Sequence, residues 1–282
     1  MRLRTPAPLV AVLALALLSA CGSGGSSRTI IVATTTSIQD SGLLDVLLPA
    51  FETQTGIRAK AIAVGSGAAI AMAARGDADA VFVHDPKAEA QAVAAGDLVD
   101  GVLVMTNDFL IVGPPDDPAQ VRAARDAADA FRRIAVAGVP FVSRGDNSGT
   151  HAKELTLWTA VGVDPSTLSG RLESGQGMGA TLTIASERRA YTLTDRATYT
   201  VLRATLALEP LFQGDAELVN PYHAYVVNPE RHRGVRADLA RAFVRFLVSP
   251  EAQRAIAAFG LERYGEPLFV PADPRAREEP GR

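Results

Sequence analysis

The sequence predicts an α/β protein with a mainly parallel sheet. Short runs rich in β-branched residues alternate with segments whose apolar residues recur at helical spacing, as in Thr29–Ala33 followed by Leu43–Phe51. With 282 residues, of which 48% are hydrophobic and 21% charged, the chain can form one large or two modest globular domains. The formal net charge of −3 argues against a nucleic-acid partner, because proteins of that class are usually strongly basic.

The N-terminus has the features of an export signal. Two arginines precede the apolar run Leu9–Leu18, which is too short to span a bilayer as a helix. The stretch Leu18-Ser19-Ala20-Cys21 then resembles the lipobox of bacterial lipoproteins, in which the cysteine becomes the lipidated first residue of the mature chain. We therefore predict a signal peptide over residues 1–20, a lipidated Cys21 with a flexible tether over 21–28, and a lipid-anchored location outside the cytoplasmic membrane. The alternative is an ordinary secretory signal with a chance cysteine.

The first part of the body shows three strand–loop–helix units in succession. The first helix is expected to start at an N-cap formed by Asp40 or Ser41, and the third at Pro86. The pattern predicts strands over 29–33, 57–64 and 79–83, and helices over 43–51, 68–74 and 87–95.

The rest of the chain continues the alternation. Residues 139–142 form a predicted strand that leads directly into the polar stretch Ser143–His151. We further predict strands at 109–113 and 225–228 and a strand-to-helix turn at 191–195. One helix is expected to end near residue 133. Further helices are expected over 150–161, 178–190, 196–202, 239–247 and 250–259. The charged, proline-rich residues 271–282 are expected to be a disordered tail.

Three loops share one chemistry, because each follows a predicted strand, precedes a helix and offers hydroxyl groups. Free N–H groups at a helix N-terminus attract anions, and open α/β folds bind ligands at the carboxyl ends of their strands. The alternative for any single loop is that its Ser or Thr only caps its own helix. The loops are Thr35-Thr36-Ser37, Gly65-Ser66-Gly67 and Ser148-Gly149-Thr150.

Arg144 lies between the strand 139–142 and the third of these loops. Its guanidinium group offers planar, charge-assisted donors to an oxyanion. The alternative is an ordinary ion pair with Asp146 or Glu154.

Enzyme motifs are mostly missing from the sequence. It contains neither a G-x-S-x-G elbow nor a phosphate-binding G-x-x-x-x-G-K-[ST] loop, and its four histidines lack the spacing of a zinc site. We expect no cofactor and no metal bound directly by protein ligands. A secreted serine hydrolase that uses Ser148 with His151 remains the alternative from another class.

Taken together, five motifs resemble those of the tungstate-binding proteins of bacterial ABC importers. The resemblance covers about residues 29–259 and implies a binding protein rather than an enzyme, with a two-lobed type II periplasmic-binding-protein fold and an ABC permease as partner. Its implied ligand residues are Thr35, Thr36, Ser37, Ser66, Arg144, Ser148 and Thr150. The motifs are ATTTS (33–37), AVGSG (63–67), SRGDNSGTH (143–151), ESGQGMGATL (173–182) and YTLTDRATY (191–199).

The resemblance also implies two crossover strands between lobes of a monomer, each lobe being a helix-flanked sheet. We place the crossovers near 106–109 and 220–223. The first lobe is then expected to contain residues 29–107 and 221–270, and the second lobe residues 108–220.

The nature of the oxyanion stays open between several ions. Tungstate and molybdate are tetrahedral dianions near neutral pH and only accept hydrogen bonds, as does the smaller sulfate. Phosphate carries a proton there and would gain from a carboxylate acceptor, for which Asp85, Asp146 and Asp195 are candidates. We expect these three carboxylates to bind helix termini or Arg144 instead.

Overall fold

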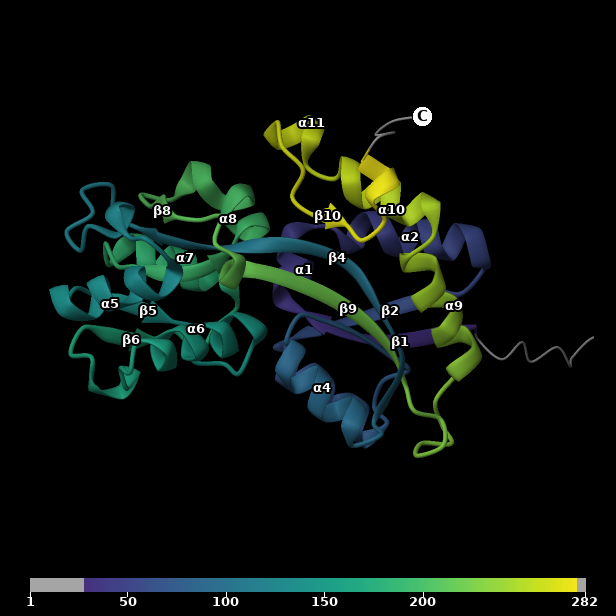
Figure 1. Ribbon diagram of the computed structural model, residues 1–282. Coiled ribbons are helices and arrows are strands. Elements are labelled where there is room, and N and C mark those ends of the chain that lie inside the picture. Colours follow the sequence, from purple (N-terminus) through teal and green to yellow (C-terminus); the bar gives the residue numbers. More distant parts are fainter. Residues whose placement is uncertain (1–27, 278–282) are drawn as a thin grey trace, which may run out of the picture.

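The computed structural model describes residues 28–277, which form two lobes joined by two long strands (Figure 1). Strands β4 and β9 run through both lobes, and the main sheet has the order β10-β4-β9-β3-β1-β2. β1 pairs in parallel with β2 and β3, whereas β9 pairs antiparallel with β3 and β4. These strands are β1 (Thr29–Thr35), β2 (Arg58–Val64), β3 (Ala80–Val83), β4 (Leu98–Gly113), β9 (Val219–Val227) and β10 (Val270–Pro271).

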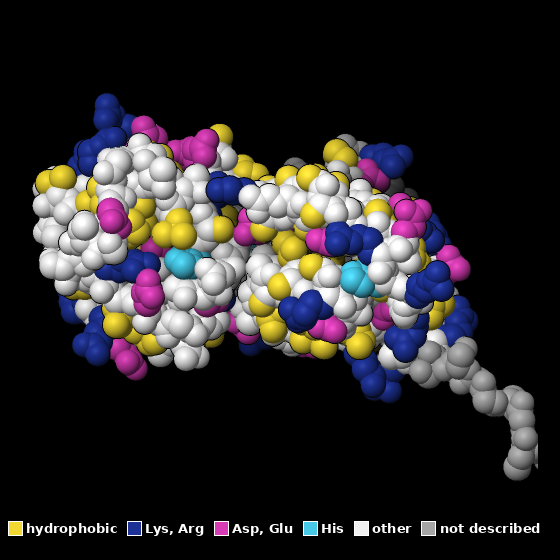
Figure 2. All heavy atoms as spheres, turned by 90° about the horizontal axis from the view of Figure 1, so that it is seen from below, with side chains coloured by type: hydrophobic (Ala, Val, Ile, Leu, Met, Phe, Trp, Pro, Cys, Tyr) yellow, Lys and Arg dark blue, Asp and Glu magenta, His cyan; other side chains and the backbone are white. Residues whose placement is uncertain are grey.

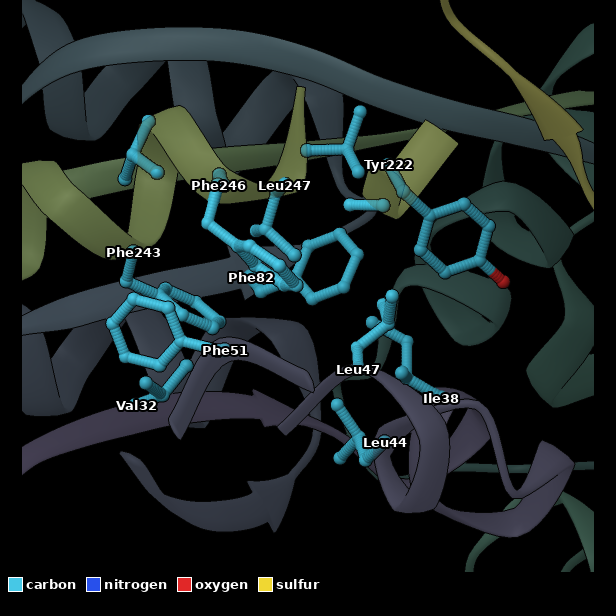
Figure 3. Close-up of a cluster of buried hydrophobic side chains, with 14 of the residues drawn as sticks. Val32, Ile38, Leu44, Leu47, Phe51, Phe82, Tyr222, Phe243, Phe246 and Leu247 are labelled. Carbon is cyan, nitrogen blue, oxygen red and sulfur yellow. The ribbon is translucent and has the colours of Figure 1, made fainter. Parts of the chain in front are cut away.

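The first lobe packs helices on both faces of this sheet. Because neighbouring residues of a strand point to opposite faces, Val32 belongs to one buried cluster and Ala33 to another. Figure 3 shows the cluster on the Val32 side, where Phe51 lies 5.2 Å from Phe243 between ring centroids. The helices are α1 (Thr36–Ser41), α2 (Leu44–Thr55), α9 (Ala237–Leu247), α10 (Pro250–Ala258) and α11 (Leu261–Tyr264), with α3 (Ser66–Arg75) and α4 (Pro86–Ala94) contributing to the Ala33 side.

The second lobe is built around the far half of β4. This half pairs antiparallel with β7 and β8, while β5 and β6 form a separate parallel pair. Trp158 anchors the core, with its ring 4.5 Å from that of Phe131 and 5.2 Å from that of Phe141. The elements are β5 (Phe141–Ser143), β6 (Arg171–Glu173), β7 (Thr192–Asp195), β8 (Glu209–Phe212), α5 (Ala127–Ala137), α6 (Gly149–Ala160), α7 (Met178–Glu187) and α8 (Arg196–Leu202).

Several predicted element boundaries are wrong. The first helix starts at Thr36 rather than after Asp40 or Ser41, because the Thr35 side chain accepts a hydrogen bond from Ile38 N–H at 3.4 Å and caps it. Gly42, with a φ of 82°, ends that helix. β4 and β9 begin well before the predicted strands at 109–113 and 225–228, because the two strands pair with each other there despite a weak local pattern.

The prediction of a disordered tail over 271–282 is wrong for residues 271–277. Pro271 pairs with Met105, and the Asp273 N–H donates to Gln253 Oε1 at 2.9 Å. Residues 278–282 lie outside the described residues, as do the predicted signal peptide, Cys21 and most of the predicted tether. Between residues 28 and 277, no helix combines the length and the apolar composition needed to cross a membrane.

The two lobes touch each other where the predicted polar loops meet, and the space-filling view shows the two lobes in contact (Figure 2). The Gly67 N–H at the start of α3 donates to the carbonyl oxygen of Asn147 in the second lobe, at 3.3 Å. Gly149, at the start of α6, packs against His84 so closely that a Cβ there would lie 2.3 Å from the His84 carbonyl oxygen. The structure therefore has its lobes closed on one another.

Gly149→Ala should consequently favour an open arrangement of the lobes. The added methyl group meets the carbonyl oxygen and the buried ring of His84, and overpacking of this kind costs about 1–3 kcal/mol. We expect a larger radius of gyration by small-angle X-ray scattering. Gly234→Ala is the control, because no atom lies within 4 Å of a Cβ at that position. An unchanged radius of gyration for Gly149→Ala would contradict the closed contact.

Candidate functional site

The first lobe presents hydroxyl groups at the ends of two neighbouring parallel strands. Thr35 and Val64 are register partners at the ends of β1 and β2, so the residues that follow them emerge at the same edge. Ser37 is 1% exposed and Ser66 is fully buried, and neither Oγ has a hydrogen-bond partner among the described residues. Both serines lie in the first turn of a helix, where backbone N–H groups are also directed outward from the helix.

The second lobe contributes the stretch between β5 and α6. Arg144 follows β5 and is only 2% exposed, although its charged group would ordinarily face solvent. Ser148 caps α6, with its Oγ accepting from the His151 N–H at 3.2 Å. Thr150 is 1% exposed, and its Oγ1 lacks a partner within residues 28–277. Gly145 and Asn147 have positive φ angles of 61° and 57°, which bend the chain between Arg144 and Ser148.

Arg144 joins the two lobes directly. Its Nη2 donates to Thr36 Oγ1 of the first lobe at 3.1 Å and also pairs with the Asp146 carboxylate. Its Nε donates to the carbonyl oxygen of Gln176 at 3.3 Å. These three groups fix the guanidinium plane. Arg144 therefore forms the ion pair with Asp146 that the sequence analysis gave as an alternative, and it also lies at the lobe interface.

The seven residues predicted to bind the oxyanion differ in what their side chains contact: two cap helices, Thr36 and Arg144 bond to each other, and three have hydroxyl groups without a partner in the described structure. The Thr35 and Ser148 side chains cap their own helices, as the alternative from the sequence proposed. The Thr36 hydroxyl receives the Arg144 guanidinium. The buried hydroxyl groups without a partner in the described structure belong to Ser37, Ser66 and Thr150.

Contacts across the lobe boundary bring the loops of the two lobes together. A Cβ on Gly65 would lie 3.3 Å from the Asp146 carbonyl oxygen and 3.4 Å from Ser148 Cα. With the Arg144–Thr36 hydrogen bond, this places the start of α1, the start of α3 and the start of α6 around one interlobe region. The region is rich in donors and has Arg144 as its buried cation.

The nearby carboxylates are engaged elsewhere, as expected. Asp195 accepts from the N–H and the hydroxyl group of Thr198, and burial raises its pKa. Asp85 accepts from the Ala88 N–H at 3.1 Å, and burial raises its pKa too. Asp146 pairs with Arg144 and also accepts from the Ser148 N–H at 3.1 Å. The expectation that these three bind helix termini or Arg144 is confirmed.

The sequence analysis gave His84 no role at the site and considered Glu154 only as an ion-pair partner of Arg144, whereas Arg144 pairs with Asp146. His84 is 2% exposed and follows β3, and its pKa is lowered to about 3 because burial and the Arg144 charge both disfavour the imidazolium form. Glu154 accepts from the Ser143 hydroxyl group at 2.6 Å and from Trp158 Nε1 at 3.2 Å. The position of His84 after a strand was a usable signal, whereas the partners of Glu154 depend on tertiary packing. No cluster of three or more metal-binding side chains occurs within residues 28–277.

The proposed pairing of Ser148 with His151 lacks the geometry of a hydrolase. The Ser148 hydroxyl oxygen accepts a hydrogen bond from the backbone N–H of His151, and His151 Nδ1 accepts from the Asn147 N–H at 3.1 Å. The imidazole ring is therefore engaged with the loop backbone rather than with the serine.

Comparison with known proteins agrees with this geometry. The sequence profile of the PBP superfamily domain matches residues 22–251. The chain is 45% identical over 245 residues to the tungstate-binding protein TupA of Peptoclostridium acidaminophilum, covering 86% of this chain and 85% of that protein. The crystal structure of a tungstate ABC transporter protein from Geobacter sulfurreducens is similar with a TM-score of 0.74 at 48% identity, covering 81% of this chain and 97% of that one. The tungstate-binding protein TupA from Desulfovibrio alaskensis G20 gives 0.73 at 42% identity, covering 86% and 98%.

The fold and the interlobe site thus define a solute-binding protein of the periplasmic-binding-protein superfamily, and the predicted type II fold is confirmed. Within that superfamily, the chain belongs to the TupA family of tungstate-binding proteins. The protein is a binding component and not an enzyme, so the alternative of a serine hydrolase is wrong.

Glu154→Ala should destabilise the second lobe beneath Arg144. The substitution removes the acceptor shared by Ser143 and Trp158 and one of the two carboxylates beside Arg171, which keeps its ion pair with Glu173. Leaving the buried Trp158 Nε1–H without an acceptor costs about 1–3 kcal/mol. Urea unfolding would measure this loss, with the exposed Glu187→Ala as control. Equal midpoints for the two variants would show that the network contributes no stability.

Proposed function

We propose that this protein captures tungstate between its two lobes and delivers it to an ABC permease. The observation that carries the proposal is the convergence of Ser37, Ser66, Thr150 and Arg144, which supply buried donors from separate segments of the chain. The membership of the TupA family supports it independently. Thr35, Thr36 and Ser148 complete the proposed set by orienting those segments and their backbone N–H groups.

The chemistry of the donors favours a fully ionised dianion. Tungstate, molybdate and sulfate present only acceptors, which complement hydroxyl, guanidinium and backbone N–H donors. A protonated phosphate needs an acceptor as well, and Asp85, Asp146 and Asp195 already accept hydrogen bonds from other groups. Molybdate has nearly the radius of tungstate, so it remains the competing ligand, and sulfate is distinguished by its smaller size.

Binding is expected to stabilise the closed arrangement of the lobes. A charge-assisted hydrogen bond contributes about 1.5–3 kcal/mol, so donors from both lobes are needed to offset the desolvation of a dianion. We place the lobe boundaries at 107/108 and 220/221. The pairing of Asn107 with Asn220 and of Asp108 with Val219 supports this placement, since there β4 and β9 are each other's neighbours between the lobes.

The proposed working location is outside the cytoplasmic membrane, in agreement with similar proteins that are described as periplasmic. The lipobox-like stretch before Cys21 supports attachment of the mature chain by lipid groups. A monomer tethered in this way can reach its permease without a transmembrane segment of its own.

Arg144→Ala should weaken tungstate binding by well over tenfold without unfolding the protein, because it removes the cation of the site. Calorimetry of the mature chain with tungstate, molybdate, sulfate and phosphate tests both the variant and the choice of ion. The exposed Arg188→Ala controls for the loss of one positive charge. A wild-type preference for phosphate, with only micromolar or weaker tungstate binding, would overturn the function, and an unchanged dissociation constant would remove Arg144 from the site.

Cys21→Ser should release the protein from the membrane. In a bacterial host that lipidates exported proteins, we expect the wild type to partition into the detergent phase of Triton X-114 and the variant into the aqueous phase. Equal partitioning of both proteins into the aqueous phase would favour an ordinary secretory signal.

A further inference from the structure

His84 occupies a position beside the proposed site that the donors described above do not explain. It follows β3 directly, and its ring packs at a tilt against that of Tyr222 from β9, with the centroids 4.6 Å apart. The Nδ1–Cε1 edge faces α6 so closely that a Cβ on Gly149 would lie 2.8 Å from Nδ1 and 3.0 Å from Cε1. Gly149 separates Ser148 from Thr150, so the imidazole lies against the second-lobe part of the site.

The hydrogen bonds around His84 determine which ring nitrogen carries its proton. His84 Nδ1 lies 3.0 Å from Asn220 Oδ1. The amide of Asn220 is oriented by its other end, because Nδ2 donates to Asn107 Oδ1 at 2.8 Å and to the Tyr222 hydroxyl oxygen at 3.0 Å. With the Asn220 amide in this orientation its oxygen faces His84, so the neutral ring carries its proton on Nδ1 and a lone pair on Nε2.

This Nε2 atom is buried and has no hydrogen-bond partner within the described residues. It shares that property with the hydroxyl groups of Ser37, Ser66 and Thr150. The hydroxyl groups can each donate a hydrogen bond to an oxyanion. A nitrogen lone pair instead repels a ligand that can only accept hydrogen bonds. A proton at Nε2 removes this conflict and converts the nitrogen into a charge-assisted donor.

We propose that His84 belongs to the oxyanion site and holds the bound dianion as an imidazolium, so that each capture event takes up a proton at Nε2. This inference rests on the proposed function. The proton comes from solvent, Nδ1 keeps its hydrogen bond to Asn220, and no covalent bond between protein and ligand is made.

The charges that face His84 explain why a bound ligand would change the protonation of the His84 ring. Arg144 opposes the imidazolium form and Asp146 favours it, and these two already pair with each other. Tyr222 stays neutral, because burial raises its pKa well above the usual value. His84 also borders a groove of about 740 Å³ between α4 and α6, and Lys87 and Lys153 are among the residues that line this groove. A dianion outweighs these cations and raises the pKa of His84 in the complex.

The sign of the pH dependence follows from this change. The pKa of His84 is lowered to about 3 in the structure described and is higher in the complex, so the complex binds more protons than the free protein. Affinity therefore rises as pH falls between the two pKa values, by up to tenfold per unit. Tungstate itself stays fully ionised at pH 6–8 and does not contribute.

The test is calorimetry of the mature wild-type protein with sodium tungstate at about pH 6, 7 and 8, in pairs of buffers that differ in ionisation enthalpy. We expect net proton uptake on binding. His84→Gln should bind tungstate about tenfold or more weakly at pH 6 and lose the uptake, while the control His232→Gln, at a ring that packs on Gly76, should keep both. Nitrogen-15 spectra of histidine-labelled wild type should show an imidazolium at His84 only with tungstate present.

The outcomes separate this inference from the function on which it rests. Tungstate binding without proton uptake, or uptake that persists in His84→Gln, would overturn the role of His84 and leave the receptor function intact. Failure of the wild type to bind tungstate would overturn both. If His84→Gln does not fold, the buffer comparison and the nitrogen-15 spectra of the wild type still decide the question.

Discussion

The interlobe site depends on holding buried hydrogen-bond donors apart from partners in their own chain. A buried polar group without a partner costs about 1–3 kcal/mol, and Ser37, Ser66 and Thr150 are three such groups in the described structure. Residues two positions apart have different roles. Thr35 and Ser148 cap their helices, whereas the hydroxyl groups of Ser37 and Thr150 have no partner in the described structure. The fold tolerates this free-energy cost because each hydroxyl group lies at a strand–helix junction, where the sheet or the helix already fixes the backbone.

Arg144 supplies the charge of the site without leaving a buried cation uncompensated. Asp146 lies two residues further on and pairs with it, and the carbonyl oxygen of Gln176 and the hydroxyl group of Thr36 fix the guanidinium plane. A side chain held in this way loses little further rotational freedom when a ligand binds, which preserves affinity. Because Thr36 belongs to the other lobe, the same contact also favours the closed arrangement.

The sequence was informative where structure is determined locally. Hydroxyl-rich loops between strands and helices could be recognised from residue type and spacing, and the capping of α6 by Ser148 follows from the same pattern. The full lengths of β4 and β9 could not be predicted, because residues such as Asp100 and Asn107 enter strands only through pairing with a distant partner. His84 was missed for a related reason: its burial and its tautomer depend on Asn220 and Tyr222, which are far away in the chain.

Asn220 links the connection between the lobes to the interior of the cleft. It lies on β9 opposite Asn107 of β4, where the two strands pass between the lobes, and its side chain bonds to both Asn107 and His84. Any rotation of β9 against β4 at this point must therefore move or break a hydrogen bond that orients His84. Since His84 also packs on Gly149 of the second lobe, the imidazole is held from both sides only when the lobes are closed. The geometry of the crossover strands and the chemistry of the cleft are thereby coupled through one buried amide.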